Sequence, residues 1–65
     1  MPTYSELGRE LKKAGCYFQE ELNGHELWYS PITDSTFLMS RHHNEEVKKG
    51  MEMFIRKKAG VPKKR

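Results

Sequence analysis

The dipeptide Asn23-Gly24 limits the fold of this chain more than any other sequence feature. It separates residues 16–22 from residues 25–30, two runs with the composition of β-strands. An Asn-Gly pair between such runs is the strongest short-range signal for a β-hairpin, because both residues tolerate a positive φ. The turn places His25 at the first position of the second strand, held in place yet close to solvent. Since an imidazole exchanges protons near neutral pH, His25 is the first candidate for chemistry.

The length of the chain sets a second limit. A single domain of 65 residues buries only about 60% of its unfolded surface, so we expect a thin core and no cofactor in a deep pocket. The lone cysteine, Cys16, excludes a scaffold stapled by an intramolecular disulfide. No apolar stretch approaches the roughly 18 residues of a transmembrane helix, and residues 1–6 lack the pattern of a signal peptide. We therefore expect a cytoplasmic protein without a membrane partner.

The first residues predict a helix from Thr3 or Tyr4 to Ala14. Thr3 and Glu6 have the spacing of a capping box, in which each side chain accepts a hydrogen bond from the backbone amide of the other residue. An apolar stripe follows at helical spacing, formed by Tyr4, Leu7, Leu11 and Ala14. Gly8 lies inside this helix, where a missing side chain permits close packing against a neighbouring element.

Three strands are expected next, over residues 16–22, 25–30 and 36–39, with turn-forming residues at 31–35. Alternation in the first strand puts Cys16, Phe18 and Leu22 on the buried face, with Glu20 as a misfit. Consecutive strands with short connections favour an antiparallel meander.

A second helix is expected near the end of the chain. Asn44 is a candidate N-cap, but Gly50 interrupts the apolar pattern, so the regular helix can also begin only near Gly50. Gly60 ends the helix and Pro62 prevents its continuation. The predicted fold is α+β with the order α-β-β-β-α, a three-stranded antiparallel sheet with two helices on one face. Residues 1–61 form this single domain, and residues 62–65 form a disordered basic tail.

Charge is distributed unevenly along the chain. Residues 40–65 hold nine Lys and Arg against three Glu, whereas residues 1–39 hold three Lys and Arg against six acidic residues. Such asymmetry favours a polyanionic partner for the C-terminal part. The alternative is a solvated helix face followed by a basic tail, and charge alone does not decide between them.

Four stretches carry a family pattern: LKKAG at residues 11–15, GHELWYSP at 24–31, RHHNEEVKKG at 41–50 and FIRKKAG at 54–60. In this order and spacing, over residues 5–61, they resemble the HicA toxins, the RNA-cleaving components of bacterial toxin-antitoxin pairs. The resemblance implies a fold like double-stranded RNA-binding domains, ribonuclease activity on mRNA, and neutralisation by a HicB-type antitoxin. It also implies that His25 is the catalytic residue.

The site predicted from the sequence consists of His25 and a set of basic residues. A histidine near its ordinary pKa can act as the base or the acid in metal-free RNA cleavage. Phosphate contacts are assigned to basic side chains of the loop and the last helix: Arg41, His42, Lys48, Lys49, Arg56, Lys57 and Lys58. No metal site is expected, because Cys16 and the three histidines match no known ligand spacing.

Three functions are therefore compared. The first is a metal-independent endoribonuclease that cleaves mRNA, with His25 as general acid or base. The second is a non-catalytic RNA-binding module of the same fold, which Glu20, Glu21 and the absence of a serine before His25 favour slightly. The third is a protein that only binds another protein through a sheet edge, and it predicts negligible affinity for RNA.

Overall fold

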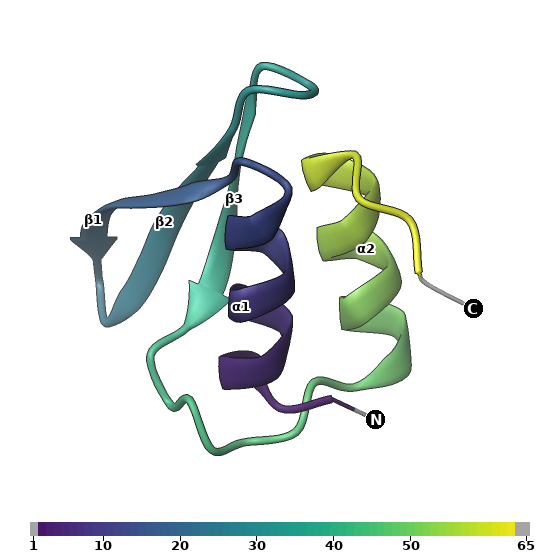
Figure 1. Ribbon diagram of the computed structural model, residues 1–65. Helices are drawn as coiled ribbons and strands as arrows, with labels where there is room; N and C mark the ends of the chain where they lie inside the picture. Colours follow the sequence, from purple (N-terminus) through teal and green to yellow (C-terminus); the bar gives the residue numbers. More distant parts are fainter. Residues whose placement is uncertain (1, 64–65) are drawn as a thin grey trace.

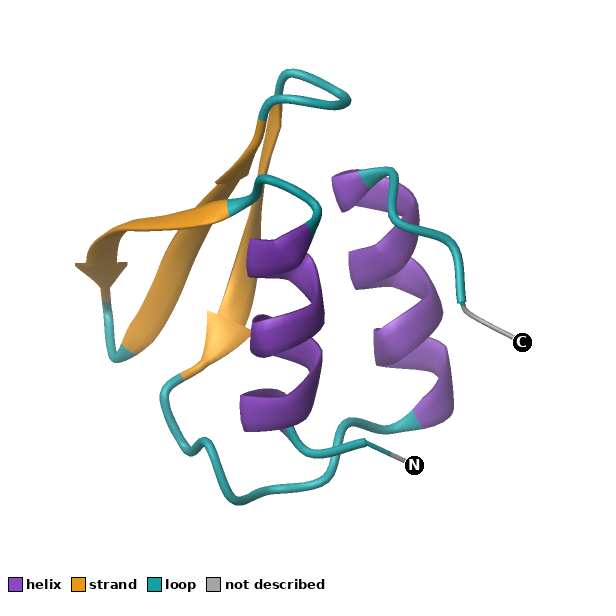
Figure 2. Ribbon diagram, viewed as in Figure 1, coloured by secondary structure: helices purple, strands orange, loops and turns teal. Residues whose placement is uncertain are grey.

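The computed structural model describes residues 2–63 and has the predicted order of helix, three strands and helix (Figures 1 and 2). The elements are α1 (Tyr4–Lys13), β1 (Tyr17–Leu22), β2 (His25–Ser30), β3 (Ser35–Ser40) and α2 (Lys49–Ala59). The α+β class and the α-β-β-β-α order are thus confirmed.

The sheet is an antiparallel meander with the strand order β1-β2-β3. The predicted turn joins β1 to β2, with φ of 49° at Asn23 and 82° at Gly24. A β-hairpin with a two-residue turn requires a positive φ at both central positions, which explains why this dipeptide is placed here. β3 extends one residue beyond the predicted range at each end, to Ser35 and Ser40.

Both helices cover the same face of the sheet (Figure 1). Trp28 and Ser30 of β2 point to this face because alternate residues of a strand share a side. The Trp28 ring packs against Gly8 of α1, where an added Cβ would lie 3.3 Å from the indole. The Ser30 hydroxyl donates a hydrogen bond of 2.5 Å to the Ala59 carbonyl of α2. The layer between helices and sheet holds the buried core: Leu7, Leu11, Cys16, Trp28, Phe37, Met39, Val47, Ile55, Ala59 and Val61.

The predicted burial of β1 is wrong for two of its three residues. Cys16 is buried, but Phe18 is 47% and Leu22 41% exposed. β1 is an edge strand that lies beyond the two helices (Figure 1). A β-bulge between Phe18 and Glu20 also shifts the register, and one extra residue sends the following side chains to the opposite face. Leu22 therefore pairs with His25 on the uncovered face of the sheet.

The two helix starts differ in their agreement with the sequence. The capping box of Thr3 and Glu6 is present at the start of α1. In contrast, Asn44 is not an N-cap, because α2 begins at Lys49 near Gly50. The segment before α2 instead binds the N-terminal end of the chain, because the Glu45 carbonyl accepts a 3.0 Å hydrogen bond from the Tyr4 amide.

Gly60 ends α2 with a φ of 74°. A Cβ at this position would lie 2.8 Å from Thr33 and 2.9 Å from Ile32. We expect Gly60→Ala to lower the free energy of unfolding by about 2 kcal/mol or more, from left-handed backbone strain and overpacking. Gly50→Ala is the matched control, because no atom lies within 4 Å of a Cβ added at this position. Alanine is favoured over glycine in a helix by up to about 1 kcal/mol, so this variant should be at least as stable as wild type. Urea denaturation of both variants measures the difference, and equal stability would contradict the prediction.

The residues after α2 contact the rest of the fold. Val61 is buried, and the Pro62 carbonyl accepts a hydrogen bond of 3.3 Å from Arg56. Pro62 therefore belongs to the folded unit. Lys64 and Arg65, the end of the predicted tail, lie outside the described residues.

Candidate functional site

His25 lines a cavity of about 570 Å³ formed by residues of β2, β3 and α2 and of the neighbouring loops. As the turn predicted, it is the first residue of β2 and is exposed to solvent. Its neighbours in the sheet are Leu22 of β1 and Ser40 of β3. His42 from the following loop and Lys58 from α2 line the same cavity. Three of the predicted site residues thus line one cavity, with His25 and His42 at its Ser40 end and Lys58 toward Thr33, which bonds to the Lys58 carbonyl.

This cavity also has an apolar wall. Leu38, Met51 and Phe54 line it, and Phe54 is 55% exposed. The His42 loop is anchored beside His25, since the His42 amide donates a 3.0 Å hydrogen bond to the Ser40 hydroxyl. Exposed apolar side chains beside two imidazoles and an ammonium group can hold a nucleobase next to a phosphate.

Most of the other predicted basic residues lie elsewhere. Arg41 forms an exposed ion pair with Glu21 at 3.5 Å, a contact that contributes little to stability. Lys48 is the N-cap residue of α2. Lys49 and Lys57 line a separate cavity of about 520 Å³ that does not include His25. The basic residues of the C-terminal part therefore form at least two surfaces.

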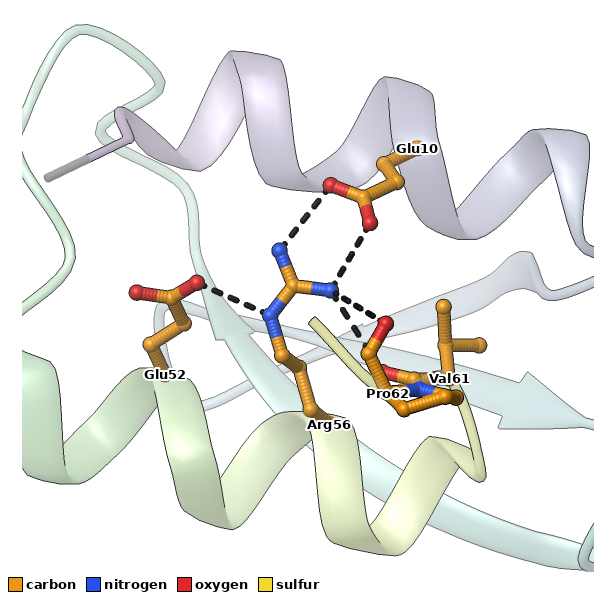
Figure 3. Close-up of polar contacts among 5 residues, drawn as sticks. All are labelled: Glu10, Glu52, Arg56, Val61 and Pro62. Atoms are coloured by element: carbon orange, nitrogen blue, oxygen red, sulfur yellow. Dashed lines mark hydrogen bonds and ion pairs between the residues drawn. The ribbon is translucent and has the colours of Figure 1, made fainter. Parts of the chain in front are cut away.

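Arg56 is a structural residue, which corrects its assignment to phosphate binding. Its guanidinium donates two hydrogen bonds to Glu10 of α1, at 2.8 and 2.9 Å, and one of 2.8 Å to Glu52 (Figure 3). The Val61 and Pro62 carbonyls accept further bonds from the same group. Arg56 is only 8% exposed. The hydrogen bonds to Glu10 raise the pKa of Arg56, and together with the bond to Glu52 they outweigh the opposing effect of burial, so the guanidinium stays charged inside the fold.

A carboxylate–imidazole pair that the sequence did not predict lies on the helix-covered face of the sheet. The side chains of Glu26 and His43 meet at 2.9 Å, and the Trp28 indole donates a 3.0 Å hydrogen bond to the other oxygen of Glu26. The Lys12 ammonium lies 5.8 Å from the centre of the Trp28 ring. The available signal was the alternation in β2, which puts Glu26 and Trp28 on one face, but nothing in the sequence brings His43 to it.

The ionised Glu26 carboxylate stabilises the fold only above its pKa. Burial raises the pKa of Glu26, but the hydrogen bonds from Trp28 and His43 and the charges of His43 and Lys12 outweigh it, so the pKa lies below its ordinary value of 4.5. Because the folded-state pKa is the lower one, this stabilisation is fully present above the unfolded-state pKa and is lost as pH falls through the folded-state pKa.

Glu26→Gln should therefore lower the free energy of unfolding by about 1 kcal/mol at pH 7. The loss should shrink as the pH is lowered below the ordinary glutamate pKa of 4.5. Urea denaturation at a series of pH values, followed by circular dichroism, measures both quantities. A loss of equal size at every pH would contradict this role of the carboxylate.

Comparison with protein-family models, with curated proteins and with solved structures gives no match. Within residues 2–63, no group of three or more His, Cys, Asp or Glu side chains is placed to hold a metal ion. No helix in the same part of the chain is long and apolar enough to cross a membrane. The chemistry of the His25 cavity and of the Glu26–His43 pair must therefore be argued from their own residues.

Proposed function

We propose that this protein is a metal-independent endoribonuclease that cleaves mRNA, with His25 as general acid or base. The observation that supports this most is the cavity lined by His25 and His42, which lie side by side at its Ser40 end. A group that exchanges protons beside a group that can bind phosphate is what cleavage by a ribose hydroxyl requires.

The reaction proceeds by attack of the 2′-hydroxyl on the adjacent phosphate. The hydroxyl loses its proton, the 2′-oxygen–phosphorus bond forms, and the bond from phosphorus to the 5′-oxygen breaks as that oxygen gains a proton. His25 serves one of these proton transfers. His42, whose amide is bonded to Ser40 beside His25, is placed to contact the phosphate oxygens, and the ring of Phe54 in the same cavity offers a surface for a base.

A non-catalytic RNA-binding module is the second candidate. Among the described residues, no hydrogen bond orients the His25 side chain, whereas a carboxylate orients His43. An imidazole without an orienting partner favours binding over proton transfer, although catalytic hydrogen bonds often form only with substrate.

Cleavage of a labelled RNA in the presence of EDTA tests the proposal. We expect purified protein to cut the RNA with chelator present and to leave DNA of the same sequence uncut, because the 2′-hydroxyl is the nucleophile. Loss of cleavage on adding EDTA would contradict a metal-independent mechanism. RNA that is bound but not cleaved would favour the second candidate.

We also propose a HicB-type antitoxin as the protein partner, acting in the cytoplasm, where mRNA is found. The resemblance to HicA toxins is the main support. The exposed side chains of Leu38, Met51 and Phe54 beside His25 offer apolar surface that a protein partner can bury while it covers the site. Binding of such a partner should inhibit cleavage in proportion to the complex formed.

A further inference from the structure

A third cavity, of about 420 Å³, lies between α1 and the helix-covered face of the sheet. Its walls contain two cations, a carboxylate, an imidazole and three aromatic rings: Arg9, Lys12, Glu26, His43, Tyr4, Phe18 and Trp28. Its volume lies within the range of about 300–1,000 Å³ that is usual for small-molecule sites. None of the residues predicted to bind phosphate lines this cavity.

The pair of Glu26 and His43 gives the cavity a fixed polar wall. The Glu26 side chain is 17% exposed, whereas that of His43 is 59% exposed. Each carboxylate oxygen already has one partner, Trp28 on one side and His43 on the other. The carboxylate therefore orients the imidazole, whose remaining nitrogen is available to a ligand. A carboxylate commonly binds the hydroxyls of a ribose, and an imidazole nitrogen can donate to or accept from a hydroxyl.

The opposite wall supplies positive charge. Arg9 and Lys12 are three residues apart on α1, so they lie on one face of the helix, and both line the cavity. Their two charges exceed the single charge of Glu26, which leaves the cavity cationic and suited to one phosphate.

An exposed ring completes the arrangement. Phe18 of β1 lines the cavity and is 47% exposed, because the edge position of β1 leaves the ring uncovered by the helices. Aromatic rings that remain open to solvent beside cations are the usual surface on which a nucleobase stacks.

We propose that this cavity binds one ribonucleotide. Arg9 and Lys12 contact the phosphate, the base stacks on Phe18, and the pair of Glu26 and His43 binds the ribose hydroxyls. The site is separate from His25 and does not depend on cleavage there. Tyr4, Met39 and Ser40 line both cavities, so one RNA chain that passes Ser40 can occupy the two together.

Titration of the full chain with adenosine 5′-monophosphate tests this assignment. Trp28 is the only tryptophan, so its indole N–H gives a single resonance that reports on the cavity wall. We expect the nucleotide to shift this resonance in a saturable way. Lys12→Ala should weaken binding about tenfold, the effect of losing one hydrogen bond to a charged group. Lys13→Ala is the matched control, because Lys13 does not line the cavity, and it should leave the affinity unchanged.

Two further ligands separate the parts of the proposal. Inorganic phosphate should bind more weakly than the nucleotide, and 2′-deoxyadenosine 5′-monophosphate should do so as well. No shift of the Trp28 resonance at millimolar nucleotide would overturn the proposal, and so would phosphate binding as tightly as the nucleotide. Equal affinity for the deoxynucleotide would overturn the contact with the ribose.

The outcome does not depend on catalysis. The His25→Ala variant should bind adenosine 5′-monophosphate with wild-type affinity even where it no longer cleaves RNA. A failure of RNA cleavage and a failure of this nucleotide site are therefore separate results.

Discussion

Replacing Arg56 by methionine should lower the free energy of unfolding by about 3–5 kcal/mol, the effect of breaking a buried ion pair by removing one partner. The substitution leaves the Glu52 carboxylate, whose side chain is 6% exposed, without its 2.8 Å partner. It also removes the two hydrogen bonds that join α1 to α2 through Glu10. A domain of this length has about 3–10 kcal/mol of total stability, so the substitution should remove about a third of it or more.

A second substitution separates loss of packing from the unpaired charge. Glu52→Gln in the Arg56→Met background removes the uncompensated carboxylate, and it should recover part of the lost stability. Lys57→Met is the matched control, because Lys57 is exposed on the same helix and should change stability by less than about 0.5 kcal/mol. Urea denaturation at neutral pH measures all four proteins. An Arg56→Met protein within about 1 kcal/mol of wild type would refute the structural role.

Arg56 also shows where a sequence-based prediction fails. Within the run Arg56-Lys57-Lys58, nothing in composition separates the first residue from its neighbours. The Glu52–Arg56 spacing of four residues was an available signal for a helical ion pair. The bond to Glu10 spans 46 residues, and contacts of such separation follow from the packing of α1 beside α2. The local charge pattern therefore predicted a basic surface, but it did not predict which basic residue is buried in ion pairs within the fold.

The strands show the same limit at a finer scale. The Asn23-Gly24 turn and the bounds of β2 followed from local preferences, because turn geometry depends on the residues at the turn. The faces of β1 did not follow, since one bulge reverses the alternation after Phe18. Glu20 was the one sequence signal of this bulge, because a glutamate did not fit the predicted buried face. A misfit of this kind in an otherwise alternating strand marks a place to expect a bulge.

The sequence predicted the part of the candidate site that the Asn23-Gly24 turn positions. His25 lies where the hairpin predicted, at the exposed start of β2. Which basic residues accompany it depends on how α2 packs along β3, and this selects Lys58 rather than Lys49 or Lys57. Helical spacing alone does not reveal which face of α2 meets the sheet edge when charged residues occur on all sides.

The proposed role of His25 in RNA cleavage gives the second large expected effect. His25→Ala should lower the rate of RNA cleavage by about 10²–10⁴-fold, the usual contribution of one general acid or base. The loss should appear in kcat more than in KM, because proton transfer takes place in the transition state and not in the bound substrate. Binding of an uncleavable DNA oligonucleotide, measured alongside, should change by less than about twofold, since His25 is one of several groups lining the cavity.

Two controls decide whether this loss is chemical. His25→Ala should keep the wild-type free energy of unfolding, because the side chain is exposed and no hydrogen bond to it is present among the described residues. Lys13→Ala should keep the wild-type rate, because Lys13 lines neither histidine-containing cavity. In cells without an antitoxin, expression of wild type should arrest growth and His25→Ala should not. If the purified His25→Ala protein cleaves RNA at the wild-type rate in EDTA, the proton transfer belongs to another residue, and His43, already oriented by Glu26, becomes the first one to replace.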